Sequence, residues 1–278
     1  MARIAICAPS TPFTRPDAAR ILALASAEFP QHALHFHEQC FAEEGHFAGS
    51  DALRLAAFLE CANDPTFDAV WFVRGGYGAN RIAGAAMAAM GAAARDKAYL
   101  GYSDGGTLLA ALYRAGIGRP VHAPMPADIR RAGGDEAIRR VFSWLGGGSD
   151  EGLEPSLDDR LTVAFNLMTL AMLVGTDLMP DLAGHVVMVE EVSEHLYAID
   201  RLLFHVTHHL APMGIAGLRL GRVSDIPENG RPFGAEPEAM ARYWCDRAGI
   251  AWLGRADIGH DSGNKIVPFG VAGQAPRP

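Results

Sequence analysis

The sequence predicts an α/β protein built around a parallel sheet, and three observations support this prediction. Short, almost continuous apolar runs alternate with segments of helical spacing through the first half of the chain. Two of these runs break directly into glycine-rich turns, at Gly75 and at Gly101. The composition changes to glycine, serine, proline and acid between Gly146 and Ser156, which is typical of a linker. We therefore expect a first domain over residues 1–148, a linker over 149–160 and a second domain over 161–278.

The clearest strands lie in the first half, because strands buried on both faces of a parallel sheet have continuous apolar sequences. The expected strands are residues 3–8, 33–37, 68–73 and a segment that ends at residue 100. Helices are expected from residue 16 to about residue 28, over 51–62, after residue 78 and from residue 107. Pro16 suits a first helical position, and Ser50 and Asn80 are candidate N-caps.

The second half alternates less regularly. The apolar segment 161–174 indicates a buried helix, and residues 185–190 a strand that ends in acid. Apolar residues at helical spacing predict a helix over 198–210. Further strands are expected at 217–223, 251–253 and 265–269.

Composition excludes several classes of function. The chain has 278 residues, of which 49% are hydrophobic, and a formal net charge of -8, which argues against a nucleic-acid-binding surface. No apolar run is long enough to span a membrane, and the first residues do not form a secretory signal. The four cysteines are widely spaced, which indicates free thiols in a reducing compartment, so we expect a cytoplasmic protein.

The stretch Gly101-Tyr-Ser-Asp-Gly105 fits G-x-S-x-G, the pattern of a serine held on a sharp strand-to-helix turn. Such a turn presents the Ser103 hydroxyl at the edge of the sheet, and the N–H of Asp104 lies at a helix N-terminus, where it can stabilise negative charge. If Ser103 is a nucleophile on this turn, it should have an unusual backbone conformation. The alternative is a Ser or Asp that only caps the helix.

A serine nucleophile needs a base, an acid that orients the base, and N–H donors for the oxyanion. The turn Arg74-Gly-Gly-Tyr-Gly78 should open at the same sheet edge and could supply a donor, although a plain turn or a phosphate-binding loop is also possible. His260 lies in a polar, glycine-flanked loop and is a candidate base. Glu190 and Glu191 end an apolar strand, so one of them could be a buried acid, although capping or solvated roles are possible for both.

A metal site is a weaker interpretation. His205 and His209 have the i, i+4 spacing that can hold a metal, but no glutamate stands between them as in H-E-x-x-H. We therefore expect a surface or interface helix at this position.

Together these stretches resemble the LD-carboxypeptidase family of serine peptidases, which includes the microcin C immunity hydrolases. The similar segments cover nearly the whole chain and occur in the family's order: residues 4–10, 74–81, 101–104, 122–125, 189–201 and 259–270.

The resemblance implies a Ser103–Glu190–His260 triad. It also implies an oxyanion hole formed by the backbone N–H of Asp104 and of Gly75 or Gly76. It implies a flavodoxin-like, parallel-sheet N-terminal domain, a smaller, mainly β C-terminal domain, and a homodimer without metal or cofactor. One departure from the family pattern is Ala164-Phe-Asn166, where a glycine-glycine-asparagine turn is usual.

The function that follows from the resemblance is cleavage of the L,D-amide bond of a cytoplasmic muropeptide, which releases a terminal D-amino acid during wall recycling. The substrate would be a small peptide. Three alternatives remain: an amidase acting on a peptidyl-nucleotide or another small acyl amide, an α/β-hydrolase with one continuous sheet, and a non-catalytic ligand-binding relative.

Overall fold

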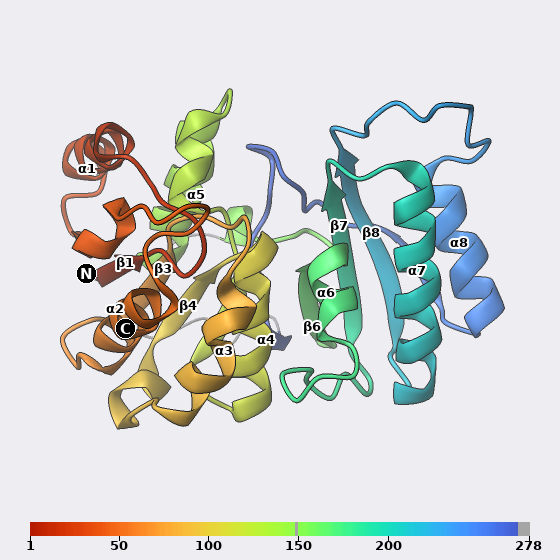
Figure 1. The fold of residues 1–278 in the computed structure, drawn as a ribbon, viewed down its shortest axis with the longest axis horizontal. Coiled ribbons are helices and arrows are strands. Elements are labelled where there is room, and N and C mark those ends of the chain that lie inside the picture. Colours follow the sequence, from red (N-terminus) through yellow and green to blue (C-terminus); the bar gives the residue numbers. More distant parts are fainter. Residues whose placement is uncertain (148–149, 272–278) are drawn as a thin grey trace.

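The computed structural model describes residues 1–147 and 150–271, which form two sheets lying side by side, each with its own helices (Figure 1). The predicted α/β class is confirmed. Gly148 and Ser149, where the first domain was predicted to end and the linker to begin, lie outside the described residues, as does the polar tail from residue 272.

The first sheet has six strands in the order β10-β5-β4-β3-β1-β2. Five of them are parallel and short: β1 (Arg3–Cys7), β2 (Ala33–Phe36), β3 (Ala69–Phe72), β4 (Ala98–Gly101) and β5 (Arg119–His122). Residues of β1, β3 and β4 are buried on both faces, which explains why their sequences lack polar alternation.

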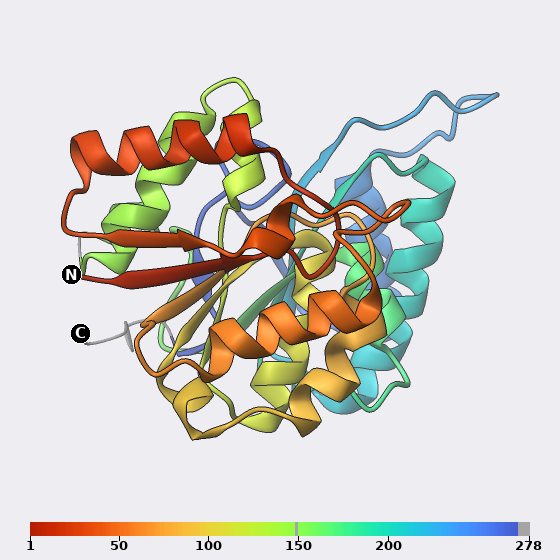
Figure 2. The ribbon, with the colours of Figure 1, turned by 60° about the vertical axis from the view of Figure 1, so that its left-hand side comes forward.

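Helices cover both faces of this sheet (Figure 2). Helices α1 (Arg15–Glu28) and α5 (Gly134–Leu145) share a core with Ile4, Trp71 and Leu100. The opposite face packs against three helices: α2 (Asp51–Asn63), α3 (Ala79–Ala88) and α4 (Gly106–Ala115). The carboxyl ends of β3 and β4 therefore open at one edge, between the two helical layers.

The second sheet has five strands in the order β11-β6-β7-β8-β9. Four of them are parallel: β6 (Leu161–Asn166), β7 (Val186–Val192), β8 (Gly217–Ser224) and β9 (Trp252–Arg255). One face packs against three helices: α6 (Leu167–Leu173), α7 (Leu196–Leu210) and α8 (Pro237–Ala248). The other face packs against the segment around Ile258.

The expectation of a mainly β second domain is corrected in its balance, because α6, α7 and α8 accompany the sheet. The buried helix expected over 161–174 is also wrong: the segment forms strand β6 and then helix α6. A continuous apolar run does not by itself separate a buried strand from a buried helix. The change occurs at Asn166, whose side chain accepts a hydrogen bond from the N–H of Thr169 at 3.1 Å and so caps α6.

The end of the described chain joins the two sheets. Strand β10 (Val267–Pro268) pairs antiparallel with β5 of the first sheet, and β11 (Gly270–Val271) pairs antiparallel with β6 of the second. The segment between β9 and β10, which contains His260, is thus held close to the first sheet. No helix among the described residues has the length and apolar character needed to cross a membrane.

Candidate active site

Ser103 occupies the turn between β4 and α4 with a φ of 57°, in the left-handed region that non-glycine residues rarely adopt. This confirms the predicted unusual backbone at Ser103. The flanking glycines have a packing reason, because a Cβ at Gly101 would lie 2.7 Å from Cδ2 of Phe72 and one at Gly105 would lie 3.0 Å from the same atom. The G-x-S-x-G pattern therefore lets β3 pass directly beneath the strained turn.

The glycine turn after β3 lies against the serine. A Cβ at Gly75 would lie 2.9 Å from the Ser103 Oγ and 3.3 Å from the backbone nitrogen of Asp104, so only glycine fits there. The Thr11 hydroxyl donates a 2.6 Å hydrogen bond to the carbonyl of Gly75. Since the peptide is planar and trans, the N–H of Gly76 points away from Thr11.

Asp104 connects the serine turn to α3. Its carboxylate accepts hydrogen bonds from the Ser10 hydroxyl and, at 2.9 Å, from the N–H of Ala79, the first residue of α3. Burial raises the pKa of Asp104. The predicted capping of this helix by Asn80 is wrong, because the cap position is Gly78 and the acceptor is supplied by Asp104 from another element.

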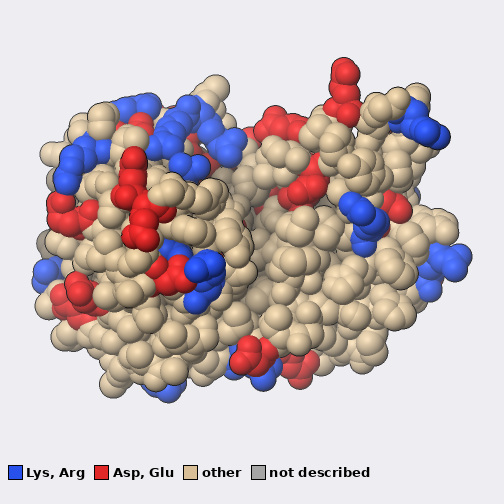
Figure 3. Space-filling view, in the orientation of Figure 1, with Lys and Arg blue, Asp and Glu red and all other residues tan. Residues whose placement is uncertain are grey.

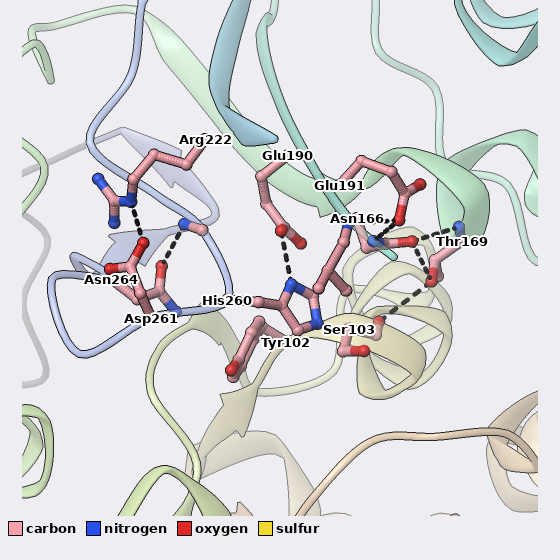
Figure 4. A network of polar contacts seen from close by, with 12 residues as sticks. Tyr102, Ser103, Asn166, Thr169, Glu190, Glu191, Arg222, His260, Asp261 and Asn264 are labelled. Carbon is pink, nitrogen blue, oxygen red and sulfur yellow. Dashed lines mark hydrogen bonds and ion pairs between the residues drawn. The ribbon is translucent and has the colours of Figure 1, made fainter. Parts of the chain in front are cut away.

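His260 and Glu190 form a buried pair. The Nδ1 of His260 donates to the Glu190 carboxylate at 2.6 Å, and the Glu190 side chain has no exposed surface. Figure 4 shows the second ring nitrogen of His260, Nε2, directed toward Ser103. Burial opposes protonation of His260, but the charge and hydrogen bond of Glu190 outweigh it, so the pKa of His260 is raised above its usual value.

Tyr102 packs against this histidine, with ring centroids 4.7 Å apart. The Tyr102 hydroxyl donates a 2.8 Å hydrogen bond to the buried Asp128 carboxylate, which also accepts from Arg131 at 3.0 Å. Burial raises the pKa of Asp128. Tyr102, the residue before the serine, therefore forms one wall for the imidazole.

The loop that carries His260 is organised by Asn264. Its Oδ1 accepts from the N–H of Gly259 at 3.1 Å and from His122 Nε2 at 3.0 Å. Burial lowers the pKa of His122 to about 4, so this histidine is neutral near pH 7 and keeps its donor role. Arg140 donates to the carbonyls of Ser262 and Asn264, at 3.0 and 2.8 Å.

Glu191 is buried as well, and its side chain points away from Glu190 toward Asn166 (Figure 4). It accepts from Asn166 Nδ2 at 2.7 Å and from the N–H of Met168 at 2.9 Å. Burial raises its pKa. Thr169 lies on α6 with Met168, and its hydroxyl donates to the carbonyl of Ser103 at 3.2 Å. Glu191 thus fixes the start of α6, which contacts the serine turn.

A pocket of about 480 Å³ opens beside Ser103, between α3 and α4 on one side and α6 on the other. Its acidic side chains are those of Asp104, Asp177, Glu191 and Glu194, and none of the described residues that line it is Lys, Arg or His. Among the residues that the structure describes, no group of three His, Cys, Asp or Glu side chains is arranged to hold a metal ion.

The structure brings the predicted residues to one place. The turns after β3 and β4 supply Gly75, Gly76, Ser103 and Asp104. Strand β7 supplies Glu190, and the segment between β9 and β10 supplies His260. No hydrogen bond joins Ser103 to His260 within the described chain. The supporting roles of Asn264, Tyr102 and Asp128 were missed, although Asn264 stands only four residues after His260 in the same polar loop.

Comparison with known proteins agrees with this arrangement. The pattern of the LD-carboxypeptidase N-terminal domain matches residues 4–123, and that of the LD-carboxypeptidase C-terminal domain matches residues 162–274. A protein of Streptomyces coelicolor that is proposed to be a carboxypeptidase is 30% identical over 97% of this chain and 89% of its own length. The murein tetrapeptide carboxypeptidase of Pseudomonas aeruginosa is 22% identical over 96% of this chain and 91% of its own length.

Two solved structures have the same fold. The muramoyltetrapeptide carboxypeptidase of Oxalobacter formigenes has a TM-score of 0.78 at 22% identity, covering 96% of this chain and 92% of its own. The microcin C7 self-immunity protein MccF has a TM-score of 0.79 at 18% identity, covering 97% and 91%.

Proposed function

The chain belongs to the LD-carboxypeptidase family of serine peptidases, and from that premise we propose that it releases a terminal D-amino acid from a muropeptide. The observation that supports this most directly is the buried His260–Glu190 pair at 2.6 Å, beside a serine held at a φ of 57°. The proposal includes a role in the cytoplasmic recycling of wall peptides and a homodimeric assembly.

In the proposed mechanism, the Ser103 Oγ attacks the carbonyl carbon of the scissile amide while Nε2 of His260 takes the hydroxyl proton. Glu190 holds the imidazole through Nδ1 and stabilises the imidazolium. The N–H of Asp104 and an N–H of the Gly75–Gly76 turn stabilise the oxyanion. The imidazolium then protonates the leaving amine as the C–N bond breaks, and a water deprotonated by His260 hydrolyses the acyl-enzyme.

The charge of the pocket favours a peptide over a nucleotide conjugate. A phosphate placed beside Glu191, Glu194 and Asp177 would meet like charges and no lining cation. MccF has been solved with glutamyl sulfamoyl guanosine, so aminoacyl sulfamoyl nucleosides of that kind are the appropriate competing substrates.

The test is turnover, followed by mass spectrometry, of a tetrapeptide muropeptide ending in D-alanine. The matched peptide ending in L-alanine and an aminoacyl sulfamoyl nucleoside serve as comparison substrates. We expect release of D-alanine, little cleavage of the L-peptide, and no activity in Ser103→Ala. Hydrolysis of the nucleoside conjugate alone, or of none of the three, contradicts the proposal.

A further inference from the structure

Three arginines follow β3 and β5, the two strands that flank the strand of Ser103, and none of the three lines the pocket. Arg74 begins the glycine turn whose next residue lies against the serine, and Arg130 and Arg131 follow β5 at the end of the 3-10 turn Pro126–Arg130. A hydrogen bond of 3.0 Å from the N–H of Ala127 to the carbonyl of Val73 holds the two segments together. Figure 3 shows Lys and Arg along one lip of the hollow between the two parts of the molecule, and Asp and Glu along the other.

Two of these three arginines have carboxylate partners and one does not. Arg130 pairs with Asp17 at 2.7 Å, and Arg131 pairs with Asp128 at 3.0 Å. Within the described chain, Arg74 forms no ion pair, and its guanidinium donates only a long hydrogen bond of 3.4 Å to the carbonyl of Pro12.

The setting of Arg74 favours an anion. Burial lowers the pKa of this half-buried arginine, and the neighbouring positive charge of Arg130 lowers it further. A bound carboxylate would relieve both effects, and a guanidinium can bind its two oxygens in parallel. The described residues that line the pocket offer no Lys, Arg or His to pair with a terminal carboxylate.

We propose that Arg74 binds the terminal carboxylate of the substrate and so determines that cleavage occurs at the last amide bond. The leaving amino acid then lies on the arginine side of Ser103, and the acyl portion of the peptide lies in the acidic pocket. This inference rests on the proposed function, because it assigns a residue to the recognition of the carboxylate that a carboxypeptidase substrate carries.

Binding to the inactive Ser103→Ala protein tests the inference without requiring turnover. The ligands are the tetrapeptide with a free C-terminal carboxylate and the same peptide as its carboxamide, measured by calorimetry. We expect the carboxylate form to bind more tightly. Adding Arg74→Ala should weaken its binding roughly 10- to 100-fold and leave carboxamide binding within about threefold.

Arg130→Ala is the matched control, because it removes a neighbouring guanidinium that Asp17 already neutralises; we expect less than a threefold effect. Arg74→Gln, checked by its melting curve, replaces Arg74→Ala if the latter unfolds. Equal affinity for the two peptides, no binding of either, or an equal loss in the Arg130 variant overturns the inference. A carboxylate preference that depends on Arg74, without turnover by the active protein, contradicts only the proposed function.

Discussion

The two halves of the site are held in different ways. Ser103 is positioned by backbone geometry: a left-handed turn, glycines that admit close neighbours, and strands β3 and β4 directly beneath it. His260 lies in an irregular loop that is held by side chains, among them Asn264, Arg140 and the pairs of Arg222 with Asp257 and Asp261. Glu190 combines the two, because its backbone is fixed within the buried strand β7 and its side chain holds His260. The comparison indicates that the serine half depends on glycines that leave no room for a side chain, whereas the histidine half depends on individual side-chain hydrogen bonds and ion pairs.

The largest effect is expected at Ser103 itself. Ser103→Ala should lower kcat by about 10⁶-fold, as loss of the nucleophile does in a serine triad. Ser103→Gly should be equally inactive but more stable, by about 1 kcal/mol, because glycine adopts a φ of 57° without strain. Melting curves and turnover of the two variants check this. A glycine variant less stable than the alanine variant would contradict the view that the turn is strained.

Glu190→Gln should lower activity by roughly 10⁴-fold, because the amide preserves size but does not stabilise an imidazolium. Its melting temperature should change little. Glu191→Gln should be milder, about 10- to 100-fold. Strand alternation turns Glu191 away from Glu190, but Glu191 still holds Asn166 and the start of α6. Turnover of the two variants shows which glutamate is the acid of the triad. An inactive Glu191 variant beside an active Glu190 variant would reverse the assignment.

Asn264→Ala should cost about 1–3 kcal/mol of stability, because it leaves the donors of His122 and Gly259 buried without an acceptor. Activity should fall about tenfold through displacement of the His260 loop. Denaturant unfolding and kcat measure the two effects. The control is Asn63→Ala, which removes an exposed acceptor of the Gly91 N–H and should leave kcat unchanged. Unchanged kcat in Asn264→Ala as well would mean that the loop does not depend on this residue.

The smallest effect is a shift in pH dependence. The raised pKa of His260 places the acid limb of kcat/KM above pH 6.5, and Glu190→Gln should move that limb lower. The stability of the fold changes with pH in the opposite direction to activity. The protonated His260–Glu190 pair stabilises the fold fully below the unfolded pKa of about 6.5, and this stabilisation is lost as pH rises through the folded pKa. The difference in unfolding free energy between wild type and His260→Gln should therefore be larger at pH 5 than at pH 9. A constant difference would show that His260 is not protonated against Glu190.

The same contrast explains what the sequence could predict. The serine turn could be predicted because its glycines and its serine are neighbours in the chain. The polar loop made His260 a candidate base and the strand end made Glu190 or Glu191 a candidate acid, while the choice of Glu190 and the triad came from the resemblance. The segment 161–174 was misread because its apolar run fits a strand or a helix equally well, and only the cap at Asn166 separates them. The roles of Asn264 and Glu191 depend on partners that lie 142 and 25 residues away, a separation that no local pattern encodes.

Labelling of the protein by a fluorophosphonate, with the adduct located by mass spectrometry and its rate followed against pH, tests whether the two regions form one active site. We expect a single adduct on Ser103, a labelling rate that falls as pH drops below the pKa of His260, which is raised above 6.5, and at least a hundredfold slower labelling in His260→Gln. An adduct on another residue, or equal rates in wild type and His260→Gln, would contradict the assembly of one active site from these two regions.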